Sequence, residues 1–305
     1  MRTLAKTRTP SHYIECVNLA IDHVINHLAE PLRLDRVARA AHLSPFHFHR
    51  VFQVLVGETI ADFVKRLRLE KALVQMAHSR RSSLTAIAFS CGFSSSSDFS
   101  RSFRQCFGVS PSKFDIKKWR DTHASELKAA IPSSGFHVNK LPPVANPDHF
   151  RVRIRDLPAR TVAYIRVTNP YEGNAVAQAT SRLIAWAERN NIASNQWLGY
   201  QWDNPEFTAL ENCHYYVAVE APNIATPARG EIGRFRFPAM TVAEIEIRGD
   251  IHLELRALQW LYGTWLPKSR YVPADHPGFE SWIGRPFAHG TAHFEIHIQL
   301  PVKQA

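Results

Sequence analysis

The sequence predicts a multi-domain protein, with an all-α double helix-turn-helix domain first and an α+β domain with an antiparallel sheet behind it. Apolar residues recur at helical spacing up to about residue 120, whereas helical and alternating patterns mix after about residue 150. The net charge of +10 lies wholly in residues 1–120, which hold 19 Lys and Arg against 9 Asp and Glu. The 305 residues have room for both domains, and the basic domain is expected to bind a polyanion.

Composition excludes several classes of protein. Hydrophobic residues make up 45% and charged residues 21%, as in globular rather than fibrous or disordered proteins. No apolar run approaches the roughly 18 residues of a membrane-spanning helix, and the first residues lack the apolar core of a signal peptide. We therefore expect a cytoplasmic protein with no membrane partner. The four cysteines are far apart and form no spacing typical of a metal or redox site.

The N-terminal domain contains an internal repeat, with one copy at 34–63 and the other at 84–114. One extra residue in the second turn brings an arginine, a phenylalanine and a glycine into register, pairing Arg50 with Arg101, Phe52 with Phe103 and Gly57 with Gly108. The apolar spacing predicts a helix, a turn and a second helix in each copy. Ser44 and Pro45 are suited to start a second helix, and a glycine is suited to end one.

The polar face of each second helix is expected to read DNA. Its side chains form hydrogen bonds, and an arginine at the matching place in both copies suits guanine in a major groove. The alternative, a solvated helix face, is weakened by the two matched copies on the basic part of the chain. The predicted DNA-binding residues are Phe46, His49, Arg50, Gln53, Ser96, Ser97, Ser100, Arg101 and Arg104.

Two further helices are expected in this half, at 14–28 and at 59–78. The second one joins the two repeat units. Its cations Lys65, Arg66 and Arg68 are interpreted as contacts to phosphate or solvent rather than to bases.

Residues 14–118 resemble the AraC-type DNA-binding domain. The resemblance rests on the repeat spacing and on the segments SPFHFHRVFQ, KRLRLEKA and AFSCGFSSSSDFSRSFRQCFGVSPSKF. It implies base contacts in both copies, by Phe46, His49, Arg50, Ser96, Ser97, Ser100 and Arg101. The pair Phe114-Asp115 departs from the aromatic-Arg pair usual in the family, which affects a phosphate contact and not the fold.

Prolines between the halves break regular structure, at Pro132, Pro142, Pro143 and Pro147. We place the DNA-binding domain at 1–120, a linker at 121–149 and a small-molecule-binding domain at 150–305. Strands are expected in the last domain at 150–155, 161–168, 197–202, 214–220, 239–247, 279–284 and 292–300, and helices at 174–190 and 251–266. A strand, turn and helix occur twice in similar order, which predicts two pseudo-twofold halves on one sheet.

Residues 150–303 resemble the GyrI-like effector-binding domain. The segments that carry the resemblance include LPARTVAYIRVTNPY, WLGYQWDNPEFT, ENCHYYVAVEAP and PGFESWIG. It implies that Glu280 faces an aromatic pocket, where a carboxylate and ring faces would suit a lipophilic cation. The alternative is a Glu280 that is hydrogen-bonded or solvated at a strand edge. Candidate ring partners, each of which also fits a plain core, are Tyr164, Tyr171, Trp186, Trp202 and Trp282.

The expected protein is thus a sequence-specific transcription regulator that binds double-stranded DNA and a small aromatic or cationic effector. RNA polymerase is a further candidate partner. Two recognition helices in one chain make a dimer unnecessary, so a monomer is expected. No catalytic residue, metal site or cofactor is predicted. Two alternatives stay open: a hydrolase that uses Glu280 as general acid or base on an electrophile, and an architectural DNA binder without a ligand.

Overall fold

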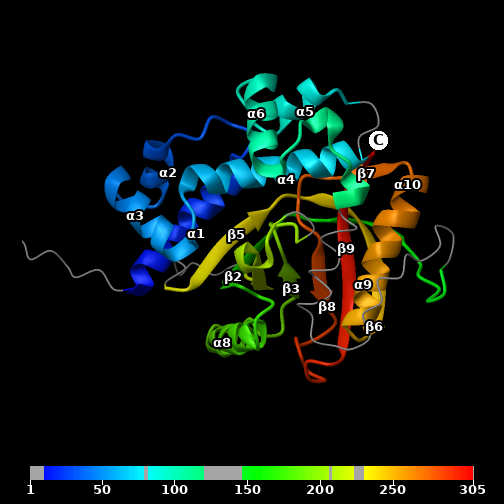
Figure 1. Cartoon of the computed structure of the whole chain (residues 1–305). Helices are drawn as coiled ribbons and strands as arrows, with labels where there is room; N and C mark the ends of the chain where they lie inside the picture. Colours follow the sequence, from blue (N-terminus) through cyan, green and yellow to red (C-terminus); the bar gives the residue numbers. More distant parts are fainter. Residues whose placement is uncertain (1–9, 79–81, 120–145, 206–207, 223–229, 305) are drawn as a thin grey trace, which may run out of the picture.

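The computed structural model describes residues 10–78, 82–119, 146–205, 208–222 and 230–304 (Figure 1). The predicted linker at 121–149 lies outside the described residues, apart from 146–149. In the part of the chain that the structure describes, no helix is long and apolar enough to cross a membrane.

The first domain is helical, as predicted. Its helices are α1 (Pro10–Asn26), α2 (Leu34–Ala40), α3 (Pro45–Val56), α4 (Ile60–His78), α5 (Leu84–Ser90) and α6 (Ser96–Phe107), followed by the short η1 (Pro111–Lys113). The pair α2 and α3 and the pair α5 and α6 are the two helix-turn-helix units.

Helix α4 is shared by both units. Its first half, including Phe63 and Leu67, joins the core of α1, α2 and α3. Its second half, including Leu69 and Leu73, joins the core of α5 and α6. A displacement of α4 would therefore alter the packing of both helix-turn-helix units.

The second domain is built on one nine-stranded antiparallel sheet. Its strands are β1 (Arg153–Leu157), β2 (Arg160–Thr168), β3 (Trp197–Tyr200), β4 (His214–Glu220), β5 (Ile232–Phe237), β6 (Met240–Gly249), β7 (Tyr271–Pro273), β8 (Phe279–Trp282) and β9 (Phe294–Gln304). The order is β1-β6-β9-β8-β3-β4-β2-β5, and β7 pairs with β9. β5 and β7 were not predicted.

The sheet has the two predicted halves, which exchange a strand. In one half β3, β4 and β2 are neighbours, and in the other β8, β9 and β6 are. β1 pairs with β6 of the later half, and β5 pairs with β2 of the earlier half. The halves meet where Gly199 of β3 lies opposite Glu280 of β8.

Two helices cover one face of the sheet, which we call the helix face. They are α8 (Ala175–Arg189) on the first half and α9 (Ile251–Trp260) on the second, the latter continued by a π-helical turn (Leu261–Trp265) and α10 (Leu266–Lys268). The predicted helix 251–266 is therefore not one regular helix. The core under these helices contains Val217, Ile245 and Ile298.

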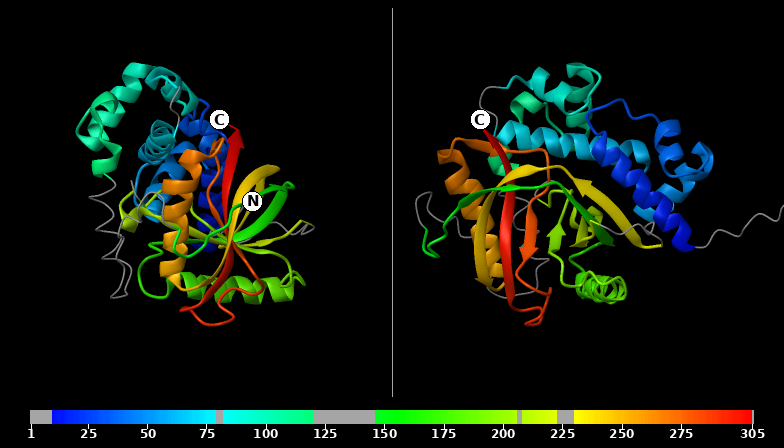
Figure 2. Two further views of the ribbon diagram at one scale, coloured as in Figure 1. Left: turned by 90° about the vertical axis from the view of Figure 1, so that its right-hand side faces the viewer. Right: turned by 180° about the vertical axis from the view of Figure 1, so that it is seen from behind.

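The opposite face is aromatic, and the helical domain packs on it. This aromatic face is formed by Tyr164, Tyr200, Tyr216, Phe235, Phe237 and Phe279. Ile25 of α1 packs against it, and the Tyr164 hydroxyl donates to both Asp22 carboxyl oxygens of α1 at 2.8 and 2.9 Å. Figure 2 shows the helical domain on one side of the sheet and α8 on the other.

Candidate nucleic-acid interface and effector site

Helix α3 presents the first predicted reading face. The Ser44 hydroxyl accepts from the backbone N–H of His47 at 3.4 Å, Pro45 starts the helix, and Gly57 ends it at φ 87°. Phe48 and Phe52 are fully buried, which turns the opposite side outward. Of the predicted DNA-binding residues there, Phe46, Arg50 and Gln53 are exposed and His49 is half-buried.

Helix α6 repeats this construction in the second unit. The Ser95 hydroxyl accepts from the N–H of Asp98 at 3.1 Å, and Gly108 ends the helix at φ 76°. Phe99 and Phe103 are buried. All of the predicted residues on its other side are exposed, namely Ser96, Ser97, Ser100, Arg101 and Arg104.

The two arginines occupy equivalent places. Each helix has 12 residues, and Arg50 and Arg101 are the sixth residue of their helices. The guanidinium carbon of Arg50 lies 5.9 Å from the centre of the Phe46 ring. Figure 1 shows α3 and α6 on the outer side of the helical domain, away from the sheet. Both faces are thus open to a partner, and base reading by them stays a prediction.

The interpretation of Arg66 and Arg68 as phosphate or solvent contacts is wrong. Arg68 donates to the backbone oxygens of Leu28 at 3.0 Å and Glu30 at 2.6 Å. The Arg66 side chain is only 17% exposed and is held by Glu58, Glu70 and Asp203. Sequence spacing gives no sign of Asp203, which lies 137 residues away.

Glu280 lies on the helix face, between the two halves of the sheet. The Tyr215 hydroxyl of β4 donates to one Glu280 oxygen, and Glu280 is also hydrogen-bonded to Glu254 of α9. This arrangement requires a glycine at position 199, because a Cβ there would lie 1.7 Å from the Tyr215 oxygen and 2.8 Å from Glu280 Oε2. Strand, helix and glycine together create a group of two carboxyls and a hydroxyl, in which Glu254 and Tyr215 are buried and Glu280 is half-buried.

Burial disfavours the charged forms of both carboxyls in this group. Burial raises the pKa of Glu280, against the lowering by hydrogen bonds from Tyr215 and Glu254. Burial and the charge of Glu280 raise the pKa of Glu254 well above its usual range. Desolvation penalises a charged carboxyl that has no cation beside it.

Glu254 and Tyr215 were not predicted as site residues. A signal for Glu254 exists, since it stands one helical turn before Leu258 on the apolar stripe of the helix predicted at 251–266. Tyr215 alternates with Val217 and Val219, which marks it as inward-facing. Neither pattern, however, names the carboxyl of Glu280 as the partner.

Two of the five predicted ring partners, Trp282 and Trp186, lie on the same side as Glu280, and a third, Tyr171, lies near it. Trp282 is two residues further along β8, and Trp186 of α8 packs against the same core. Tyr171 donates to the side chain of Gln201 at 3.3 Å, and the charge of Glu280, after burial and the nearby Cys213, contributes to raising its pKa.

Tyr164 and Trp202 do not join this group, which corrects the prediction. Tyr164 lies on the aromatic face and bonds to Asp22. Trp202 packs there too, with its ring 6.1 Å from that of Phe237 and nearly parallel to it. Side chains of a strand alternate between faces, so the position of Tyr164 along β2 decides its face, not its aromatic character. Trp202 lies two residues beyond the end of β3 and packs on the same side as Tyr200.

Comparisons with known proteins follow the same two-part division. The helix-turn-helix domain family matches residues 37–115, and the GyrI-like small molecule binding domain family matches residues 150–303. The regulatory protein PocR of Salmonella typhimurium is 31% identical over 121 residues, which are 40% of this chain and 40% of PocR. The HTH-type transcriptional activator RhaS of Escherichia coli is 39% identical over 105 residues, 34% of this chain and 37% of RhaS.

The chain thus spans less than half the length of these two relatives. Among solved structures, the EcmrR C-terminal domain is 18% identical and covers 52% of this chain and 99% of that domain, with a TM-score of 0.40.

Proposed function

Since the chain belongs to the GyrI-like small-molecule-binding family and carries an AraC-type helix-turn-helix domain ahead of it, we propose that it is a transcription regulator that binds DNA and senses a small cationic effector. The observation that carries the effector half is the pair formed by the half-buried Glu280 and the buried Glu254 on the helix face. The DNA half rests on the two exposed, matched faces of α3 and α6.

Charge supports double-stranded DNA as the partner. The excess of ten positive charges lies in residues 1–120, so phosphates would attract that domain specifically. Two reading helices in one chain fit successive major grooves about 34 Å apart, one helical turn of DNA. A monomer then suffices to read both half-sites. Contact with RNA polymerase would follow from activation at a promoter.

The effector proposed for the second domain is an aromatic cation. Two carboxyls whose pKa values are raised in a desolvated site gain from a ligand that brings one positive charge and stabilises an ionised carboxylate. Trp186 and Trp282 supply ring surface on the same side of the sheet, and Tyr171 lies near Glu280. Ring faces add attraction for a cation that a neutral ligand of the same shape does not receive.

The test is a calorimetric titration of the full-length protein with benzyltrimethylammonium and with its neutral isostere neopentylbenzene. Glu280→Gln keeps the size of the side chain and removes its charge. It should weaken binding of the cation by about 1–2 kcal/mol, roughly 5- to 30-fold, and leave the affinity for the neutral compound nearly unchanged. Glu211→Gln, which changes an exposed carboxylate of the same domain, is the matched control and should change neither.

The same titration has a defined pH dependence. Because burial raises the pKa of both Glu280 and Glu254, lowering the pH protonates them and removes the charge that the cation needs. The quaternary probe keeps its charge, so its affinity should rise with pH. Equal losses for both compounds in Glu280→Gln would make Glu280 a structural residue, and no loss for either would remove it from the site.

A regulator of this kind needs no catalysis, and we propose none. Turnover of an electrophilic ester by the protein, abolished in Glu280→Gln, would instead favour the hydrolase alternative.

A further inference from the structure

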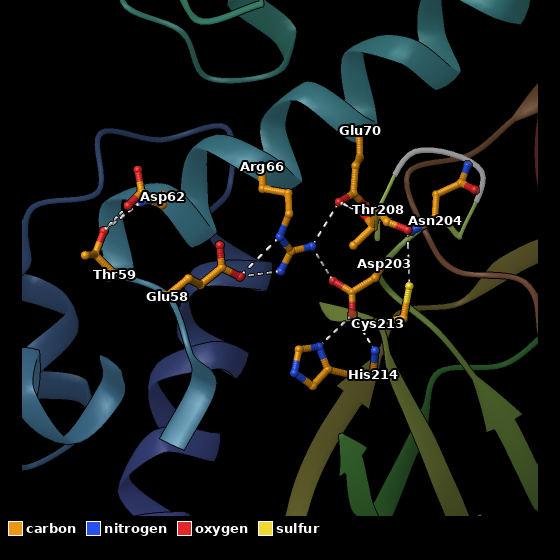
Figure 3. A network of polar contacts seen from close by, with 10 residues as sticks. All are labelled: Glu58, Thr59, Asp62, Arg66, Glu70, Asp203, Asn204, Thr208, Cys213 and His214. Carbon is orange, nitrogen blue, oxygen red and sulfur yellow. Dashed lines mark hydrogen bonds and ion pairs between the residues drawn. The ribbon is translucent and has the colours of Figure 1, made fainter. Parts of the chain in front are cut away.

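Arg66 lies at the centre of the contact between the two domains. Its guanidinium donates to Glu58 Oε1 at 3.1 and 2.7 Å, to Glu70 Oε1 at 2.9 Å and to Asp203 Oδ1 at 2.7 Å. Glu58 and Glu70 belong to the helical domain, whereas Asp203 follows β3 of the sheet. Figure 3 shows Arg66 reaching from α4 toward all three carboxylates. One buried cation therefore ties α4 to the second domain.

Glu70 makes a second crossing at the same place. It accepts from the backbone N–H of Asn204 at 2.9 Å and from the Thr208 hydroxyl. Burial raises the pKa of Glu70 to about 7, against the lowering by the charge of Arg66. For Asp203 the balance is reversed, since hydrogen bonding from His214 and the charge of Arg66 outweigh burial and lower its pKa. Asp203 is thus a charged partner of Arg66 from the second domain.

Asp203 also holds the start of β4. Its Oδ2 accepts from the backbone N–H and from the ring Nδ1 of His214, each at 2.8 Å. The next residue along the strand is Tyr215, whose side chain points to the helix face and donates to Glu280. Successive strand residues face opposite sides of a sheet, so one peptide unit joins the Arg66 contacts to the effector site.

We propose that the chain Glu280–Tyr215–His214–Asp203–Arg66 couples the effector site to α4, and so to both helix-turn-helix units. This inference rests on the proposed function of Glu280. A cation that takes over the Glu280 carboxylate releases or redirects the Tyr215 hydroxyl. The start of β4 then shifts against Asp203, and Arg66 transmits the shift to α4, which is shared by both helical cores.

Such coupling is reciprocal. If the effector changes the affinity for DNA by some factor, DNA changes the affinity for the effector by the same factor. The experiment uses the full-length protein, benzyltrimethylammonium, and a duplex selected by that protein from a random library. The dissociation constant of the cation is measured with and without saturating duplex, and that of the duplex with and without saturating cation. The two ratios should agree and differ from one by at least about fivefold.

Asp203→Asn removes the charge that faces Arg66 and keeps an oxygen that can accept from His214. It should bring both ratios close to one, while each single affinity stays within about threefold of wild type. Arg66→Lys, which keeps the charge and loses the fork geometry, is the second variant. The matched control is Lys71→Gln. Lys71 also bridges α4 to the second domain, to Asp275 at 3.2 Å, but is not on the chain to Glu280, so the ratios should persist.

Failure of the coupling and failure of the effector proposal are distinguishable. Absence of cation binding to the wild type contradicts the proposed function. Cation binding with ratios of one, or ratios that survive in Asp203→Asn, overturns the coupling alone. Amide exchange of the peptide 213–217 tests the coupling from the DNA side without any effector. Binding of the duplex should change its exchange in the wild type and not in Asp203→Asn, and unchanged exchange in the wild type overturns the inference.

Discussion

Arg50 and Arg101 stand at equivalent points of two capped helices, and both side chains are exposed. A guanidinium that bonds one guanine by two hydrogen bonds discriminates against other bases by about 1–3 kcal/mol. Arg50→Ala and Arg101→Ala should each lose about that much at the selected duplex. Each should relax specificity at one base pair, and the two positions should lie about one helical turn apart. Competition binding against single-base variants of the duplex measures both effects.

Arg285→Ala is the control for these two variants. Arg285 is 57% exposed, pairs with Glu188 on the second domain and is distant from α3 and α6 in sequence and fold. It should leave specificity unchanged. Equal loss on selected and random duplex for Arg50→Ala would reduce its role to a phosphate contact.

At this scale the sequence identifies residues whose role is local. The caps, the buried phenylalanines and the exposed face of α3 and α6 all follow from spacing within one helix. The sequence fails for roles that depend on contacts between domains. Arg66 is a cation on a helix of the basic domain, which is typical of a phosphate contact. It is instead buried at the interface between the domains, where it pairs with Asp203. For the same reason the sequence did not distinguish Tyr164, which bonds to Asp22, from Tyr171, which lies near Glu280.

Among the structural elements, the turn of the second helix-turn-helix unit makes a close contact with the segment after α1. Gly92 has φ +89°, and a Cβ there would lie 2.5 Å from the Leu28 oxygen and 2.9 Å from Ala29 Cα. Gly108 has a similar φ of +76° but nothing within 4 Å of such a Cβ. Gly108→Ala should therefore lower the free energy of unfolding only by the strain of a left-handed alanine, about 1–2 kcal/mol. Gly92→Ala should cost about 1–3 kcal/mol more, because backbone atoms must move.

Urea unfolding of the full-length protein measures this difference in free energy. Gly57→Ala, with φ +87° and open space, is a second control and should behave like Gly108→Ala. Equal losses in the free energy of unfolding at all three glycines would mean that the turn of the second unit does not pack tightly against the loop after α1.

Regular elements with their own apolar period were predictable, and the exchanged strands were not. The helices α1 to α6 and the strands β2, β4 and β9 were each predicted from local alternation or helical spacing, within a few residues. β5 has only six residues, two of them exposed arginines, and its partner β2 lies about 70 residues earlier. The exchange of β1 and β5 between halves is a property of the whole sheet, which no local pattern encodes.

At the scale of the whole molecule, the proline-rich stretch predicts two independent domains, but the interface between them has two different sides. On the sheet it is aromatic, with Tyr164, Phe235 and Phe279 buried to at least 96%. On the helical domain it includes the polar groups of Asp22, Arg66 and Glu70. Burial raises the pKa of Asp22 to about 8, against the hydrogen bonds from Tyr164 and the charge of Arg166. Separation would therefore be tolerated well by the helical domain and poorly by the sheet domain.

This asymmetry gives a prediction for the two separated domains. A fragment of residues 1–119 exposes groups that water solvates readily, so it should stay monomeric and bind the selected duplex. A fragment of residues 146–305 exposes the aromatic face, and contiguous apolar surface of that kind drives association and binds hydrophobic dyes. Its fluorescence with 1-anilinonaphthalene-8-sulfonate should exceed that of the intact protein several-fold, and sedimentation should show self-association. Addition of fragment 1–119 in excess should lower the dye signal, because α1 and α4 cover the same face again. A 146–305 fragment that is monomeric and binds no more dye than the intact protein would mean that the two domains are joined by the linker rather than by this interface.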